Sequence, residues 1–448
     1  MYNAFLDYFR CPDELSPFRQ MGEPIGAKGF FRFGKDAVCF GRTFSGRVAQ
    51  SATSPLEDVL PSVQLNEHTC YLPFDAGEIV ENLRLERYCK SPSSNGSGPK
   101  KSLVRNAYYA VRPLLPVSVR KHLQRAALRG WDQIPFPHWP VDQSVDRILE
   151  TMLLLAIRTT GDRIPFIWFW PDGHDGCATM THDVETAQGR DFCSSLMDLN
   201  DSFGIKSSFQ VVPEERYAVP EKFLSEIRER GFEVNVHDLN HDGNLFQERI
   251  EFLHRAAQIN LYAKSFGAVG YRSGVLYRNL DWYDAFDFSY DMSVPNVGHL
   301  DPQQGGCCTT KPYFVGKILE IPVTATQDYT LFNILRQYST DLWQKQVQSI
   351  LGLHGMASFI VHPDYVIDQR AREVYAGLLA YLARLRQDSS LWIALPREVN
   401  DWWRMRQQST LVRRGDGWKI EGPAGKRARI AYASAEGDRV TYDIEPVS

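Results

Sequence analysis

The chain has 448 residues, of which 43% are hydrophobic and 23% are charged, so it can bury a sizeable core and is not disordered by composition. A chain of this length suits two or three domains. Its formal net charge of −4 provides no global basic field, which argues against a nucleic-acid-binding protein.

The eight cysteines and the first residues of the chain favour an intracellular protein. The cysteines form no CxxC pair and show no zinc-ribbon spacing, and Cys307 and Cys308 are adjacent, so we interpret all eight as reduced thiols. Residues 1–20 contain several acidic side chains and no long apolar run, unlike a signal peptide. No apolar run is long enough to span a bilayer. We therefore expect a cytoplasmic location.

Short strands and helices are predicted for the first part of the chain. Residues 30–41 favour a hairpin and residues 69–73 a strand. Residues 91–102 are rich in Ser, Gly and Pro and predict a linker or exposed loop. Residues 103–130 predict one or two helices, and residues 144–160 an amphipathic helix.

A basic stretch, residues 100–129, is the one local exception to the acidic balance of the chain. We interpret it as a solvated helix face. The alternative is peripheral contact with a membrane surface or an anionic glycan.

From residue 177 onward, predicted strands and helices alternate, which favours a parallel α/β architecture. In a barrel of this type the site lies at the carboxyl ends of the strands. Asp183, His237, Arg272 and His362 all fall at or just past such ends. The predicted strands are 177–181, 206–212, 232–237, 268–272, 357–362 and 391–395, and the predicted helices are 190–203, 220–230, 245–266 and 368–387.

Two segments carry groups that bind divalent metals. Asp183 and Glu185 lie two apart at a strand end and point to the same side while the chain stays extended. His237 and His241 lie four apart after another strand and can face one ion. Either segment alone is a weak signal, because acidic loops and paired histidines arise without function. Together, two imidazoles and a carboxylate form a standard set for Zn²⁺ or a similar ion.

Two further residues complete the constellation. Arg272 is either a salt bridge at a strand end or a buried cation that orients Asp183. His362 closes an apolar strand, where an imidazole is either a core residue or a general acid. Taken alone, Arg272 and His362 would each be assigned a structural role. Because they occur together with the metal-binding segments, we favour functional roles for both.

These segments resemble the motifs of the polysaccharide deacetylase family, the NodB-like or carbohydrate esterase 4 type, in the family's own order. The resemblance covers about residues 175–400 and indicates a divergent bacterial subgroup. The matching motifs are 181–185 (THDVE), 237–241 (HDLNH), 271–272 (YR), 290–295 (YDMSVP) and 360–363 (IVHP).

The resemblance implies a metal-dependent hydrolysis. A metal held by one carboxylate and two histidines would assist a water, an aspartate would take the proton of that water, and the last histidine would protonate the leaving amine. It implies Asp183, His362 and Arg272 as catalytic residues and Glu185, His237 and His241 as metal ligands. It also implies that Tyr271, Asp291 and Pro295 bind substrate, and that the metal is Zn²⁺, with Co²⁺, Ni²⁺ or Mn²⁺ as alternatives.

The sequence departs from the family pattern at three places. The usual adjacent aspartates are replaced by Asp183-Val184-Glu185; by analogy with relatives that space the two acids by one residue, Asp183 is the base and Glu185 the ligand, and the reverse stays open. The residue after the first histidine is Asp238 in place of Ser or Thr, and it is expected to be a partner of a metal-binding imidazole. The proline usually two past the arginine is Gly274.

The expected fold is therefore α/β, a distorted (β/α) barrel, with an α+β N-terminal region and a small β-rich C-terminal extension. We divide the chain into a β-rich region (1–95), a helical connecting region (96–170), the deacetylase-like domain (171–405) and the extension (406–448). Residues 301–310 and 319–332 are expected to line the cleft.

The expected function is removal of acetyl groups from an N-acetylated sugar or glycan intermediate during cell-surface polysaccharide biosynthesis. The alternatives are hydrolysis of another C–N bond or of an O-acetyl ester, and a carbohydrate-binding protein without turnover.

Overall fold

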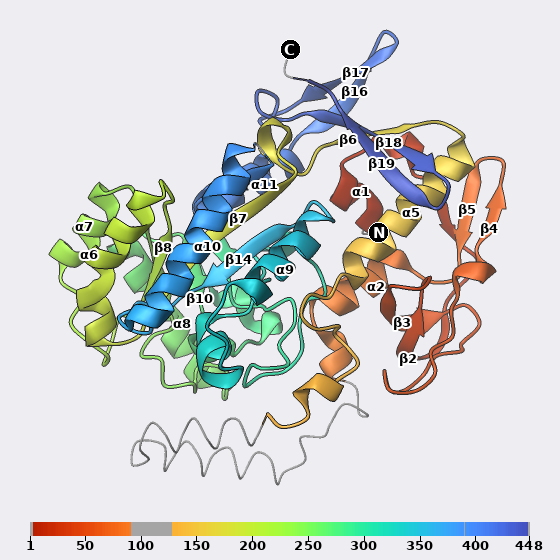
Figure 1. The fold of residues 1–448 in the computed structure, drawn as a ribbon. Helices are drawn as coiled ribbons and strands as arrows, with labels where there is room; N and C mark the ends of the chain where they lie inside the picture. Colours follow the sequence, from red (N-terminus) through yellow and green to blue (C-terminus); the bar gives the residue numbers. More distant parts are fainter. Residues whose placement is uncertain (1–2, 91–127, 389, 447–448) are drawn as a thin grey trace.

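The computed structural model describes residues 3–90, 128–388 and 390–446, and its centre is a nine-stranded, mostly parallel sheet (Figure 1). The strands run in the order β12-β13-β11-β10-β9-β8-β7-β14, with β15 also paired to β7, and only β12 is antiparallel to its neighbour. The strands are β7 (Gly176–Val184), β8 (Ser208–Val211), β9 (Glu233–His237), β10 (Gly270–Arg272), β11 (Tyr290–Asp291), β12 (Tyr313–Val315), β13 (Ile318–Glu320), β14 (Met356–Ile360) and β15 (Leu391–Ile393).

An irregular segment, residues 323–325, closes this sheet into a ring. On one side Asn296 donates its N–H to the carbonyl of Val323 (2.7 Å), and on the other Ala325 donates to the carbonyl of Ser358 in β14 (3.1 Å). Backbone hydrogen bonds outside a regular strand thus connect the segment after β13 to β14, and β12 lies outside this ring. This arrangement confirms the predicted α/β fold, a distorted (β/α) barrel.

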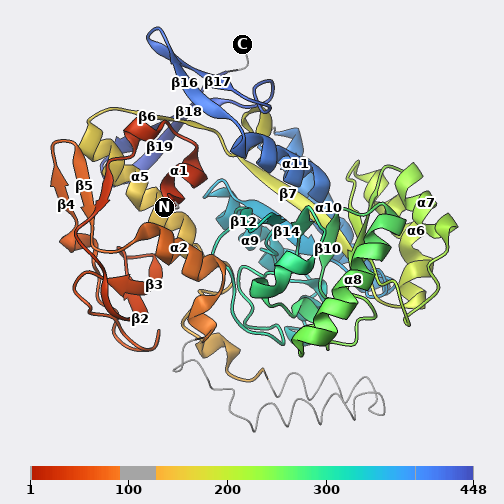
Figure 2. The same ribbon diagram turned by 180° about the vertical axis from the view of Figure 1, so that it is seen from behind.

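Helices cover the outside of the barrel, as the alternating sequence pattern predicts (Figures 1 and 2). Each of the four helices predicted between residues 190 and 387 forms, although the one predicted over residues 245–266 begins later, at Arg249. The helices are α6 (Ala187–Ser202), α7 (Glu221–Glu229), α8 (Arg249–Phe266), α9 (Asp341–Leu351), α10 (Gln369–Gln387) and α11 (Pro396–Gln407).

The two-residue alternation of β7 separates two adjacent polar side chains. Asp183 faces the barrel interior, where it meets Arg272. His182 faces outward, and its ring lies 3.0 Å from the amide of Asn200 in α6 and 3.4 Å from the hydroxyl of Tyr375 in α10. His182 therefore belongs to the packing between barrel and helices, and Asp183 is left free for the interior.

The N-terminal part packs beside the barrel around the helix α5 (Ser144–Thr160), whose bounds match the predicted ones (Figure 1). The predicted hairpin forms from β2 (Ile25–Arg32) and β3 (Val38–Thr43), and the predicted strand over 69–73 is β5 (Thr69–Leu72). The predicted linker over 91–102 lies outside the described residues, as do almost all of the predicted helices over 103–130 and the basic stretch 100–129.

The C-terminal tail forms short antiparallel strands, as predicted. β18 (Ile430–Glu436) pairs with β19 (Arg439–Ile444) on one side and with β6 (Ile164–Ile167) on the other, while β16 (Thr410–Arg414) and β17 (Gly417–Glu421) form a hairpin. The tail thus shares a sheet with a strand that precedes the barrel. The division of the chain into four regions stays a prediction.

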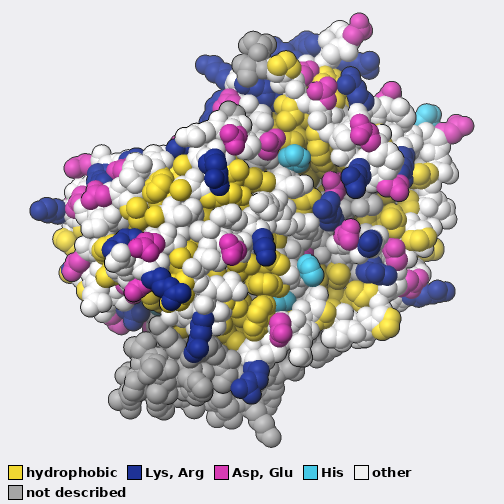
Figure 3. Space-filling model, in the orientation of Figure 1, with side chains coloured by type: hydrophobic (Ala, Val, Ile, Leu, Met, Phe, Trp, Pro, Cys, Tyr) yellow, Lys and Arg dark blue, Asp and Glu magenta, His cyan; other side chains and the backbone are white. Residues whose placement is uncertain are grey.

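The sequence argues against nucleic-acid binding and against membrane spanning, and the charged surface and the helices bear on these two expectations. On the face in Figure 3, basic and acidic side chains are interspersed, and neither sign gathers into a continuous field. Among the described residues, no helix combines the length and the apolar character needed to cross a membrane.

A buried lysine ties the helix α1 (Ala4–Phe9) to the barrel. The ammonium of Lys311 donates to the hydroxyl of Tyr8 (2.8 Å) and to the carbonyl of Leu353 (2.6 Å), and it lies 3.7 Å from a carboxylate oxygen of Asp146. Burial lowers the pKa of Lys311 to about 8, although the charge of Asp146 opposes this shift.

This lysine is expected to make the protein more stable as the pH rises from 8 to 10. An unfolded lysine titrates at a pKa of about 10.4. Between the two pKa values the unfolded chain binds the proton that the folded chain has lost, so the free energy of unfolding increases with pH. Denaturant titrations should show the unfolding free energy of the parent minus that of Lys311→Met increasing by on the order of 2 kcal/mol over this window.

The matched control is Lys317→Met, since the Lys317 side chain is 61% exposed. Its difference from the parent should not change with pH. A flat or decreasing difference for Lys311→Met would show that Lys311 keeps its charge inside the fold.

Candidate metal centre

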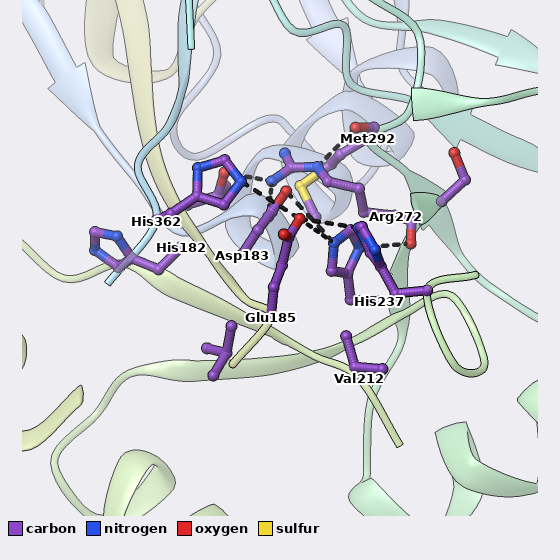
Figure 4. A network of polar contacts seen from close by, with 12 residues as sticks. His182, Asp183, Glu185, Val212, His237, Arg272, Met292 and His362 are labelled. Carbon is purple, nitrogen blue, oxygen red and sulfur yellow. Dashed lines mark hydrogen bonds and ion pairs between the residues drawn. The ribbon is translucent and has the colours of Figure 1, made fainter. Parts of the chain in front are cut away.

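Six predicted residues meet at the carboxyl ends of the barrel strands (Figure 4). Asp183 lies near the end of β7 and Glu185 just past it, His237 ends β9 and Arg272 ends β10, and His241 and His362 follow β9 and β14. Because neighbouring strands are parallel and in register, these ends share one edge of the barrel. In Figure 4 the side chains of Asp183, Glu185, His237, Arg272 and His362 turn toward one another, while His182 turns away.

Glu185, His237 and His241 form a group that can hold a metal, with one ligand atom from each residue and all three atoms within 4.8 Å of one another. The Oε1 atom of Glu185 lies 2.9 Å from Nε2 of His241 and 3.5 Å from Nε2 of His237. Asp183, Glu185 and His362 form a second, overlapping group.

The hydrogen bonding of the imidazoles fits a metal. Nδ1 of His237 lies 3.1 Å from the carbonyl of Arg272, and since a carbonyl only accepts, Nδ1 carries the proton. The Nε2 lone pair is then free. The Nε2 atoms of both His237 and His241 are buried and have no partner in hydrogen-bonding geometry, which is unusual for buried polar atoms. A divalent ion between these nitrogens and Glu185 would satisfy all three groups.

Both acidic side chains are ionised. Burial raises the pKa of Glu185, but the surrounding imidazoles, that of His241 first, outweigh it and hold the pKa well below its usual range. Burial also raises the pKa of Asp183, and the positive charge of Arg272 outweighs it, so that this pKa is lowered too. An ionised carboxylate can serve as a ligand or as a base.

Arg272 distinguishes the two acids. Its Nη1 donates to Oδ1 of Asp183 (2.6 Å) and to the hydroxyl of Thr181 (2.7 Å), and its Nε donates to the carbonyl of Met292 (2.9 Å). The guanidinium is fully buried and holds Asp183 in one orientation. Asp183 Oδ2 stays 3.8 Å from Nε2 of His237. The imidazoles therefore converge on Glu185, which favours Glu185 as ligand and Asp183 as base.

His362 has a partner that sequence reasoning missed. Its Nδ1 lies 2.7 Å from Oδ1 of Asp328, and its backbone N–H donates to Oδ2 of the same residue (2.8 Å). Burial lowers the pKa of His362, but the charge of Asp328 outweighs it and raises the pKa well above the usual value. The ring packs at a tilt of 45° against Tyr365 (4.8 Å between centroids), and Nε2 lies 3.5 Å from Glu185. A charged imidazole held in this way can donate a proton from Nε2.

Two residues expected to bind substrate do not face the cluster. Tyr271 alternates with Arg272 along β10, and its fully buried ring packs on Phe286, 4.6 Å away between centroids. The carboxylate of Asp291 accepts hydrogen bonds from the hydroxyl of Tyr283 (3.0 Å) and from the backbone N–H and hydroxyl of Ser293. Both side chains serve the packing, and their contact with substrate stays a prediction.

The other predicted residues lie outside the group of six, and their roles stay predictions. Pro295 lines a pocket, and the two segments expected to line the cleft contribute Asp301 and Gln327 to it. Asp238 is 1% exposed and follows His237 directly. The cysteines are free thiols, with Cys307 and Cys308 buried.

Comparison with known proteins gives similarity in structure only: no family model matches the chain, and no curated protein matches it. Solved structures to which it is similar include polysaccharide deacetylases and members of the carbohydrate esterase 4 family.

Three of these structures show how low the sequence identity and the structural similarity are. A candidate polysaccharide deacetylase from Mycobacterium smegmatis has 16% identity and a TM-score of 0.44 over 56% of this chain and 98% of that one. A candidate deacetylase involved in O-antigen biosynthesis in Bordetella bronchiseptica has 17% identity and a TM-score of 0.32, with coverage of 49% and 85%. A carbohydrate esterase 4 pseudoenzyme from Bacillus anthracis has 14% identity and a TM-score of 0.34, with coverage of 51% and 66%.

Proposed function

We propose that this chain is a metal-dependent hydrolase that removes the acetyl group from an N-acetylated sugar. The observation that carries the proposal is the convergence of two unpartnered imidazoles on Glu185, beside an ionised Asp183 and a charged His362. A ligand set, a base and an acid are the three groups that amide hydrolysis by water requires.

In the proposed reaction, Asp183 accepts one proton and His362 donates another. Asp183, held by Arg272, takes a proton from a water molecule as the water oxygen bonds to the acetyl carbon. His362, held by Asp328, gives its Nε2 proton to the sugar nitrogen as the C–N bond breaks, so that acetate and an amine leave. A divalent ion bound by Glu185, His237 and His241 lowers the pKa of the attacking water and polarises the carbonyl.

For the bound ion we propose Zn²⁺, with Co²⁺, Ni²⁺ or Mn²⁺ as alternatives, because two imidazoles and one carboxylate suit all four. A sugar intermediate of cell-surface polysaccharide biosynthesis, handled in the cytoplasm, stays the expectation for the substrate.

Acetate release tests the proposal. The metal-loaded protein should release acetate from at least one member of a panel of N-acetyl sugars, nucleotide sugars and lipid-linked oligosaccharides, and a chelator should stop the release. Matched O-acetyl sugars in the same panel distinguish an esterase. Sugar binding without acetate release from any of these substrates, with metal bound, would favour the carbohydrate-binding alternative and overturn the proposal.

A further inference from the structure

Two loops that face each other behind the metal ligands have a strained backbone. One follows β9 and contains Asp238 (φ 57°) and His241 (φ 56°); the other follows β10 and contains Val275 (φ 61°) and Leu276 (φ 54°). A left-handed conformation is uncommon outside glycine, and for a β-branched residue such as Val275 it is an outlier. Such strain persists only where neighbouring contacts enforce it.

The contact between the two loops is made at Gly274. This glycine has an ordinary φ, so the backbone conformation does not require it. Space does: a Cβ atom at this position would lie 2.3 Å from Oδ2 of Asp238 and 3.1 Å from Cδ2 of His241. Real Cβ atoms do not approach other atoms to 2.3 Å, so either the carboxylate or the glycine would have to change.

The side chain of Asp238 has little freedom to move away from a Cβ atom at position 274. Its side chain is buried, its Oδ1 accepts the N–H of Leu239 (2.7 Å), and its own N–H donates to the carbonyl of Arg272 (2.8 Å). That same carbonyl accepts from Nδ1 of His237. The carboxylate of Asp238 therefore lies at the contact between its own loop, which carries His241, and the loop that follows Arg272.

We propose that Asp238 is a positioning residue, whose carboxylate occupies the space left by Gly274 and holds His241 beside Glu185. The two residues then act as a pair, and a change of side-chain volume at either one alone moves an imidazole. The proposal rests on the metal ligands assigned above and not on deacetylation.

A double-mutant cycle on metal affinity tests this pair. Gly274→Ala should weaken Zn²⁺ binding, measured by chelator competition, by about 10- to 100-fold, the usual effect of disturbing a partner behind a ligand. Asp238→Ser should weaken it about 10-fold. In the Asp238→Ser background the added methyl group meets no carboxylate, so the double variant should bind no more weakly than Asp238→Ser alone.

Controls separate positioning from a general loss of structure. Ser273→Ala, the neighbouring position, should leave affinity within about 2-fold of the parent, because its hydroxyl is buried without a partner. Asp238→Asn keeps the shape and the acceptor for Leu239, and it should retain the Co²⁺ absorption spectrum of the parent. That spectrum should change in Gly274→Ala.

Equal effects of Gly274→Ala in both backgrounds, or no effect in either, would overturn the proposal. If Gly274→Ala does not fold, full Zn²⁺ affinity in Asp238→Ser would overturn it alone. A coupled cycle in a protein that releases no acetate would leave this inference standing and reject the proposed function.

Discussion

Replacing His237 by alanine is expected to remove bound metal and hydrolysis together. The imidazole ends β9 and directs an unpartnered Nε2 toward Glu185, and it supplies one of the three ligand atoms in the group of Glu185, His237 and His241. Partners behind a ligand are worth 10- to 100-fold in affinity, so loss of a ligand should exceed roughly 100-fold. Elemental analysis after gel filtration and the acetate assay measure the two losses.

His254→Ala is the matched control for this variant, because His254 lies exposed on α8, outside the cluster. It should retain both metal and activity. Full metal content in His237→Ala would mean that the ligand assignment is wrong.

Replacing Asp183 by asparagine is expected to retain metal and abolish most of the turnover. The amide oxygen can still accept from Arg272, so the local geometry survives, but an amide cannot take a proton from water. Loss of a general base costs about 10²- to 10⁴-fold in rate. The rate is measured under saturating metal, with metal content determined on the same sample.

Glu185→Gln is the companion variant and should show the opposite behaviour, with metal lost. The imidazoles converge on Oε1 of Glu185, whereas Oδ1 of Asp183 is engaged by Arg272. If Asp183→Asn loses metal and Glu185→Gln retains it, the roles of the two acids are reversed.

The sequence predicted the features that depend on neighbouring residues, and it did not predict those that depend on residues distant along the chain. Strands and helices follow from runs of neighbouring residues, so the helix over residues 144–160 was predicted with its observed bounds. Parallel pairing then placed Asp183, His237, Arg272 and His362 at one edge. The irregular closure by residues 323–325 has no such local pattern, because it depends on backbone hydrogen bonds between distant segments.

The metal-binding residue types were readable from spacing, but partners distant along the chain were not. Asp328 lies 34 residues from His362 and carries no motif, so only the fold brings the two together. Tyr271 is an opposite case. Its position next to Arg272 suggested that it lies in the site, but because side chains alternate along a strand, its ring points into the core.

The sequence by itself determined that this protein has an alternating α/β architecture and that two carboxylates and three histidines stand at its strand ends. Periodicity and spacing are properties of neighbouring residues, and they suffice for that conclusion. Only the tertiary structure decided that the imidazoles converge on Glu185, that Arg272 holds Asp183, and that Gly274 leaves room for Asp238. Those outcomes depend on side-chain direction and on contacts between loops, which no single stretch of sequence contains.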